Sequence, residues 1–134
     1  MMKRWAIFFG LFLVVIIALA DTGHLGYLGL VYRFPGGDRL GHFVLFGLLS
    51  FVIDWSLFEE HPSSSQMRLA IPAGVLLILL VGLEEFSQRF FPARHSDWVD
   101  FAFSCLGVIA FALLAVKLHE RRTWAAIRKQ GTTR

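Results

Sequence analysis

Charged residues are scarce in this chain: 17% of its 134 residues are charged, whereas 56% are hydrophobic. Soluble domains typically carry about 25% charged residues. A chain this short leaves much of its surface exposed, so this much apolar surface cannot be hidden inside a small soluble fold. The composition therefore argues against a soluble monomer. It also excludes intrinsic disorder, which requires low hydrophobicity and high net charge.

Cysteine occurs only once, as Cys105, which excludes an internal disulfide and, in an apolar run, favours a packing role. The sequence also lacks the HExxH zinc motif, the G-x-S-x-G nucleophile elbow and the Gly-Lys-Ser/Thr phosphate loop. His24, His42 and His95 lie near carboxylates and would suit zinc, but no ligand spacing supports such a site. We therefore predict no metal and no cofactor.

Long apolar stretches are what the chain does have. Four of them predict helices over about residues 5–20, 40–58, 69–88 and 97–117. A helix needs about 20 mainly apolar residues to cross a bilayer. Runs without strict alternation argue against a β-barrel, the other backbone arrangement that lipid tolerates. The predicted fold class is all-α: one polytopic membrane domain, residues 1–134, with a bundle of four transmembrane helices. The short connection 89–96 makes the third and fourth helices antiparallel neighbours.

The positions of the basic residues predict the orientation of this bundle. With both termini in the cytoplasm, the inner side holds Lys3, Arg4, Arg68 and the six Lys and Arg residues that follow residue 116. The outer side then holds Arg33, Arg39, Arg89 and Arg94. Because cytoplasmic loops carry the excess of positive charge, this N-in/C-in topology is favoured. Residues 21–40 and 89–96 become outer connections, and residues 59–68 become the inner one.

Both ends of the chain carry further signals. Ala18-Leu19-Ala20 resembles a small-residue cleavage site, so the first stretch has an alternative interpretation as a secretory signal. The apolar, glycine-rich connection 21–40 is expected to lie along the membrane interface. The basic tail, residues 118–134, is predicted to face anionic lipid in the cytoplasm rather than nucleic acid, with Trp124 and Ile127 in a short interfacial helix. His61 and His119 lie in solvated connections and carry no hypothesis.

In the predicted topology, three helices place polar residues at the same outer level. These candidate ligand-binding residues are Asp38, His42, Glu84, Glu85, Gln88, Arg94, Asp97 and Asp100. Ionisable residues at membrane depth face the bundle interior or an aqueous cavity and by default mark a functional site. We expect His42, Glu85, Gln88, Arg94 and Asp100 to converge in one pocket. The planar guanidinium of Arg94 would serve both carboxylates, and its remaining donors would face an anionic headgroup.

Ordinary helix-end chemistry offers an alternative explanation for part of this pattern. Asp97 is placed to cap the fourth helix. Glu84 and Glu85 oppose the dipole at the end of the third helix and so require a partner, but a polar network can also join helices without binding a ligand. Asp54 lies alone inside an apolar run, where it is either a proton relay or an interfacial residue beside Trp55.

Several of these residues resemble a known pattern. Asp38-Arg39-Leu40-Gly41-His42-Phe43 resembles the D-K-x-x-H-F start of the second helix in the VanZ-like family. Glu85-Phe86-Ser87-Gln88, Pro92-Ala93-Arg94, Asp100 and Gly107 are similar to that family's E-x-x-Q, P-x-R, D and G signature. Arg39 replaces the commoner Lys, and Ser104 stands where the family usually has Asn or Asp. The resemblance implies a small multi-pass protein of the bacterial cytoplasmic membrane, in a family whose founding member is associated with teicoplanin resistance.

Three interpretations of function remain open at this point. The first is a non-enzymatic membrane protein whose outer pocket binds an envelope lipid or lipid-like compound and alters glycopeptide susceptibility. The second is an enzyme acting on a lipid-linked phosphate or sugar headgroup, for which the candidate catalytic residues are His42, Glu85, Arg94 and Asp100. The third is a structural or assembly subunit. The missing nucleophile motif favours a protein that is not an enzyme. The expected partners are membrane lipids, a lipid-linked cell-wall precursor or a glycopeptide.

Overall fold

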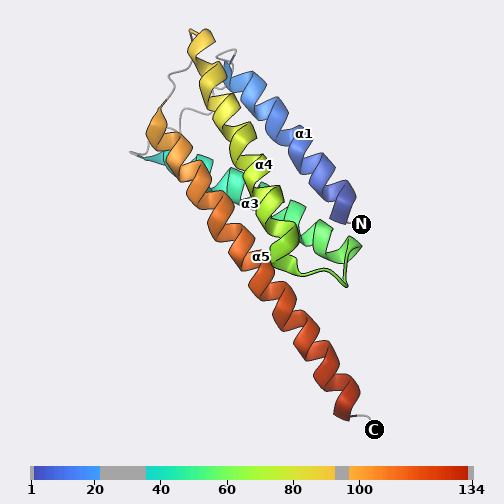
Figure 1. Cartoon of the computed structure of the whole chain (residues 1–134). Coiled ribbons are helices and arrows are strands. Elements are labelled where there is room, and N and C mark those ends of the chain that lie inside the picture. Colours follow the sequence, from blue (N-terminus) through green and yellow to red (C-terminus); the bar gives the residue numbers. More distant parts are fainter. Residues whose placement is uncertain (1, 22–35, 93–96, 133–134) are drawn as a thin grey trace.

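The computed structural model of this chain describes residues 2–21, 36–92 and 97–132, and the secondary-structure elements among these residues are all helices (Figure 1). The helices are α1 (Met2–Asp21), α3 (Gly37–Glu60), α4 (Gln66–Ser87) and α5 (Trp98–Thr132), and the 3-10 turn η2 (Gln88–Phe90) extends α4. The predicted all-α class is confirmed. His24, Arg33, Arg94 and His95, with most of the connections 21–40 and 89–96, lie outside the described residues.

Three of the helices are long and apolar enough to cross a membrane. The candidate spans are Gly37–Glu60, Gln66–Phe90 and Trp98–Gly131. In α1 the apolar part among the described residues, Ile7–Ile16, is shorter than a span. Many large apolar side chains on these helices face outward, and Leu79 and Leu83 are each 65% exposed. Such a surface is stable in lipid rather than in water, so the chain is a small multi-pass helical membrane protein.

Two helix boundaries follow from local backbone chemistry. Gly36 precedes α3 with a φ of 87°, a left-handed conformation that favours glycine, and its carbonyl accepts the N–H of Leu40 at 3.0 Å. A turn follows α3, in which the N–H of Ser64 bonds the carbonyl of His61 at 3.0 Å. Pro72 lies in the second turn of α4, which begins at Gln66. Its missing N–H removes one helical hydrogen bond there.

The last helix is longer than the sequence suggested. The prediction of a helix over 97–117 followed by a separate interfacial helix is wrong, because α5 continues without a break to Thr132. The reason is local: from Lys117 to Gln130 the chain has neither Pro nor Gly, and ten of these 14 residues are Ala, Leu, Arg, Lys, Glu or Gln, which are strong helix formers. At a rise of 1.5 Å per residue, α5 is about 52 Å long and exceeds a ~30 Å hydrocarbon core. Its C-terminal part extends past the other helices (Figure 1).

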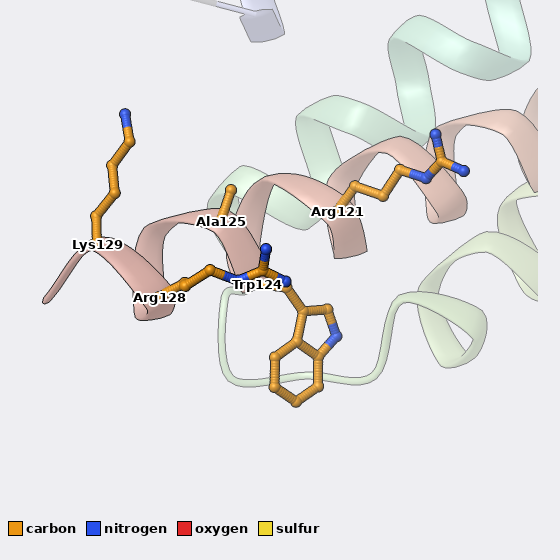
Figure 2. Close-up of a pocket in the computed structure, with 5 residues that line it drawn as sticks. All are labelled: Arg121, Trp124, Ala125, Arg128 and Lys129. Carbon is orange, nitrogen blue, oxygen red and sulfur yellow. The ribbon is translucent and has the colours of Figure 1, made fainter. Parts of the chain in front are cut away.

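This extension carries a basic and aromatic face. Arg121, Trp124 and Arg128 are spaced three and four residues apart, which places them on one side of α5, where Ala125 and Lys129 join them (Figure 2). Trp124 is 67% exposed. A tryptophan among arginines is typical of the boundary between a membrane and the aqueous phase. Trp124 and the basic residues thus share one face of a continuous helix, and the location of this face at the membrane interface stays a prediction.

The helices α3 and α5 run parallel and form the closest helix pair. Gly47 faces the ring of Phe111, and Gly107 lies directly against the backbone of Phe43, so a Cβ at either position would collide with its neighbour. Small residues let helices approach closely where lipid provides no hydrophobic driving force between them. The helix α4 packs against both α3 and α5, and α1 packs against α3. One apolar core holds Phe46, Leu77, Val81 and Val108, and a second holds Phe58, Ala70, Ala115 and Val116.

Two polar residues that seemed peripheral in the sequence are built into this packing. His119 is half-buried, with its ring 5.4 Å from that of Trp55 and 5.3 Å from that of Phe58, so its assignment to a solvated connection is wrong. Asp54 is only 1% exposed and lies inside the helix bundle rather than at the lipid interface. Both corrections follow from the pairing of α3 with α5, which the sequence did not predict, and in the case of His119 also from the continuation of α5 into the predicted tail.

Asp54 takes part in a short polar chain between α3 and α5. The Ser50 hydroxyl lies 3.3 Å from Asp54 Oδ2 and 3.2 Å from the Val108 carbonyl oxygen, and Asp54 Oδ1 has no hydrogen-bond partner among the described residues. One hydroxyl hydrogen serves one acceptor at a time. If the Asp54 carboxyl is neutral, it donates to Ser50 and Ser50 donates to Val108. If the carboxylate were ionised, its negative charge would be buried in an apolar core without enough hydrogen bonds to offset the loss of hydration.

Asp54→Asn is therefore expected to leave the free energy of unfolding in detergent within about 1 kcal/mol of the parent, because a neutral amide can also donate to Ser50. Ser50→Ala breaks the chain and is expected to cost about 1–3 kcal/mol. Ser63→Ala, on the exposed turn, is the control and should change nothing. An Asp54→Asn protein less stable than the Ser50→Ala protein would show that the charged carboxylate is the form that holds the helices together.

Candidate functional site

Polar side chains gather where α3 and α5 begin and α4 ends. We call the following residues the polar cluster: Asp38, His42, Glu84, Glu85, Gln88, Asp97, Asp100 and Ser104. Four of them, Glu85, Gln88, Asp100 and Ser104, are buried. Ionisable groups are costly to bury beside hydrocarbon and are retained where they are paired or serve a function.

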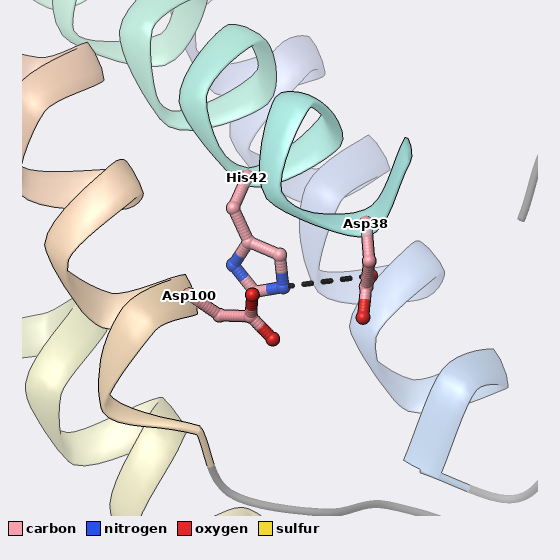
Figure 3. Close-up of side chains that lie close together, drawn as sticks. All are labelled: Asp38, His42 and Asp100. Carbon is pink, nitrogen blue, oxygen red and sulfur yellow. Dashed lines mark ion pairs between the residues drawn. The ribbon is translucent and has the colours of Figure 1, made fainter. Parts of the chain in front are cut away.

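One half of the polar cluster joins α3 to α5 and is centred on His42 (Figure 3). His42 Nδ1 lies 3.1 Å from the Ser104 hydroxyl oxygen, and that hydroxyl donates to the Asp100 backbone carbonyl at 2.9 Å. On the other edge of the ring, Nε2 lies 4.0 Å from Asp38 Oδ1, one helical turn earlier. The Asp100 carboxylate lies close to both residues, since one ligand atom from each of Asp38, His42 and Asp100 lies within 4.8 Å of the other two.

The other half joins the end of α4 to the start of α5. Glu85 Oε1 accepts the backbone N–H of Asp97 at 2.6 Å. The Gln88 amide donates to Glu84 Oε1 at 2.7 Å and lies 3.4 Å from Glu85 Oε2. Glu85 is 4% exposed and Gln88 is 2% exposed. Glu85 thus ties together two helix ends that would otherwise leave a backbone donor without a partner.

The first turn of α5 connects the two halves. Asp97 Oδ1 accepts the N–H of Val99 at 2.9 Å, which is the capping role that the alternative interpretation gave it. Asp100 follows one turn later, and its N–H bonds the Asp97 carbonyl at 3.0 Å. The structure therefore brings His42 together with Asp100 and brings Glu85 together with Gln88. Both pairs lie at the start of α5. Arg94 lies outside the described residues, so its role as their counter-charge stays a prediction.

Ser104 was missed as a site residue by the sequence reasoning. It is fully buried and bonds His42 from the position where the VanZ-like pattern usually has Asn or Asp. Its spacing of four residues from Asp100, which puts both on one face of α5, was the available signal. Ser104, His42 and Asp38 are arranged like the nucleophile, base and carboxylate of a catalytic triad, since the His42 ring lies between the Ser104 hydroxyl and the Asp38 carboxylate. The buried hydroxyl donates within its own helix, however, so it is not available to attack a substrate.

Two hollows lie on α4 and α5 near the polar cluster. A cavity of about 40 Å³ is lined by Gly82, Glu85, Phe86, Arg89, Trp98 and Phe101. The Arg89 guanidinium lies 5.2 Å from the centre of the Phe86 ring and 6.0 Å from that of Trp98. An apolar groove of about 330 Å³ lies further along the two helices, between residues 67–78 of α4 and 108–116 of α5. From Glu85 to Ile78 the rise along α4 is about 10 Å.

Comparison with known proteins identifies no relative of this chain. No protein-family model matches the chain, and no curated protein or solved structure matches it. The site is therefore interpreted from its own residues.

Proposed function

We propose that this chain is a multi-pass protein of the bacterial cytoplasmic membrane in which all four helices, α1 included, cross the bilayer. Three apolar helices of sufficient length support this, and α1 has 20 residues, about the length of a span. The basic face of the α5 extension supports placing the C-terminus in the cytoplasm, because the inner leaflet attracts Lys and Arg. In this N-in/C-in topology the polar cluster lies at the outer surface.

We further propose that the polar cluster binds the headgroup of an envelope lipid or of a lipid-like compound. The observation that carries this proposal is that three helix ends bring ionisable groups to one end of a mainly apolar bundle, and that two of these groups, Glu85 and Asp100, are buried. A bundle stapled only by packing does not need this many costly groups at one level. The apolar groove between α4 and α5 supports the proposal, since it offers a surface for an acyl chain within reach of a headgroup at Glu85.

The chemistry of the described part of the cluster favours a particular kind of headgroup. Asp38, Glu84, Glu85, Asp97 and Asp100 are carboxylates, and they accept hydrogen bonds when ionised. Hydroxyl and ammonium groups are the matching donors, as found on sugars and amino alcohols. A lipid-linked cell-wall precursor is rich in such groups. Arg94, where it joins the cluster as the sequence predicts, would add donors for a phosphate.

The VanZ-like resemblance supplies a second line of support. No family model matches the chain, so this support rests only on the motifs between residues 38 and 107. We propose membership of that family on the pattern from Asp38 to Gly107. Because of this resemblance, the susceptibility of cells to teicoplanin can be measured as a test of function. Expression of the chain in a susceptible bacterium is expected to raise the inhibitory concentration of teicoplanin, and an unchanged concentration would count against this part of the proposal.

Native mass spectrometry of the purified protein tests headgroup binding directly. We expect the parent to retain an envelope lipid, and Glu84→Gln to retain at least tenfold less, because a neutral amide replaces a charged acceptor of about twice the strength. Glu120→Gln, an exposed carboxylate on the α5 extension, is the matched control. A Glu84→Gln protein that retains the same lipid at the parent's level would contradict the proposal. Loss of stability without loss of lipid would favour a purely structural network.

A further inference from the structure

The half of the polar cluster around His42 contains three residues with side-chain atoms that can bind a metal ion, namely Asp38, His42 and Asp100. Asp38 and His42 are four residues apart on the first turns of α3, so both side chains lie on one face of that helix. Asp100 comes from the first turn of α5 and reaches the same point from the opposite side (Figure 3). One ligand atom from each of the three residues lies within 4.8 Å of the other two.

The hydrogen bonds around His42 prepare its ring for coordination. Nδ1 faces the Ser104 hydroxyl oxygen at 3.1 Å, and that hydroxyl donates its own hydrogen to the Asp100 carbonyl. Ser104 is therefore left to accept from Nδ1, which places the ring hydrogen on that nitrogen. The lone pair of the neutral imidazole then lies on Nε2, the nitrogen that faces Asp38 at 4.0 Å, and the Asp100 carboxylate lies close to the same two residues. Metal-binding histidines are commonly fixed in this way by a partner on the second ring nitrogen.

The donor set selects the class of ion. One imidazole nitrogen and two carboxylates suit zinc and similar borderline transition metals, whereas magnesium and calcium prefer oxygen donors alone. Zinc bonds to nitrogen and carboxylate oxygen at about 2.0–2.2 Å. The three donor atoms must therefore draw together slightly. Asp38 can supply this movement, because its side chain is 59% exposed on the first turn of α3, while His42 is 13% exposed.

We propose that Asp38, His42 and Asp100 form a zinc site that links the start of α3 to the start of α5. Three protein ligands leave a fourth coordination position on zinc. Because Asp38 is exposed, this fourth position lies on the open side of the cluster. Ser104 is the positioning residue, since it orients the ring without touching the metal. The alternative arrangement is a protonated His42 paired with two carboxylates, which would hold no metal. This inference does not depend on headgroup binding.

Isothermal titration of chelator-treated protein with zinc chloride tests the site. Working in lipid-free detergent separates it from headgroup binding. We expect one saturable zinc per chain, with weaker binding of magnesium and calcium. Asp38→Asn should weaken zinc binding at least tenfold, and it is the decisive variant because its exposed side chain is not needed for packing. Asp100→Asn should do the same, and Ser104→Ala should cost about 10- to 100-fold.

Two controls separate this site from scattered surface binding. His61→Ala removes an exposed imidazole beyond the far end of α3, and Glu120→Gln removes an exposed carboxylate of α5. Both should leave zinc binding unchanged. Cobalt should also give the intense visible absorption of a four-coordinate ion in the parent and lose it in Asp38→Asn. The absence of saturable zinc binding, or equal binding by the parent and Asp38→Asn, would overturn the proposal.

Discussion

Gly107→Ala is expected to be among the most damaging single substitutions in this protein, with a loss of about 3 kcal/mol or more in the free energy of unfolding. A Cβ at position 107 would collide with the backbone carbonyl of Phe43 on α3. A backbone atom cannot rotate away as a side chain can, so α3 and α5 must separate along their whole contact. That movement would also break the bonds from His42 to Ser104 and from Ser50 to Val108.

Gly41→Ala is the matched control for this substitution. A Cβ at position 41 meets no atom within 4 Å, although Gly41 lies on α3 only two residues from Phe43. Alanine has the higher helix propensity, so Gly41→Ala should be neutral or stabilising by up to about 1 kcal/mol. Thermal unfolding of both variants in the same detergent gives the comparison. Similar melting temperatures for Gly107→Ala and the parent would show that the close α3–α5 approach is not a feature of the folded protein.

Glu85→Ala carries the second large expected effect, about 2–4 kcal/mol. The substitution removes the acceptor for the part-buried Asp97 N–H and a neighbour of the buried Gln88 amide. The donor left at Asp97 would have no replacement partner, and the ends of α4 and α5 would separate. Glu85→Gln retains an oxygen for the Asp97 N–H and should lose only about 1 kcal/mol.

Chemical unfolding of these two variants in detergent, read by far-UV circular dichroism, measures the difference. Glu59→Gln provides a matched control, because Glu59 is an exposed carboxylate at the far end of α3. It should change stability by no more than about 0.5 kcal/mol. An equal loss in Glu85→Ala and Glu59→Gln would mean that the α4–α5 junction does not rely on Glu85.

The membrane class and the level of the polar cluster could be predicted because each depends on local signals. Apolar run lengths identify spans, and the ends of consecutive spans alternate between the two sides. This arithmetic alone placed His42, Glu85 and Asp100 at one end before any distance was known. The capping role of Asp97 was also readable, since it needs only a helix start and an oxygen two residues before an orphan N–H.

The parallel contact of α3 with α5 could not be predicted in the same way. Phe43 and Gly107 lie far apart in the sequence, and both helices are mainly apolar all round within their spans, so hydropathy marks no preferred partner. The burial of Asp54 and the contacts of His119 follow from that pairing and were missed with it. The length of α5 was missed for another reason: a change from apolar to basic composition ends a span without ending a helix.

The side of the membrane on which the polar cluster lies is the central claim, and cysteine accessibility measures it. In a Cys105→Ser background, Pro92→Cys marks the polar cluster and Ser63→Cys marks the α3–α4 turn, and both positions are exposed. Spheroplasts are treated with a membrane-impermeant maleimide before and after permeabilisation. Labelling of Pro92→Cys in intact spheroplasts, and of Ser63→Cys only after permeabilisation, is the result we predict. The reverse pattern would place the cluster in the cytoplasm and contradict the account.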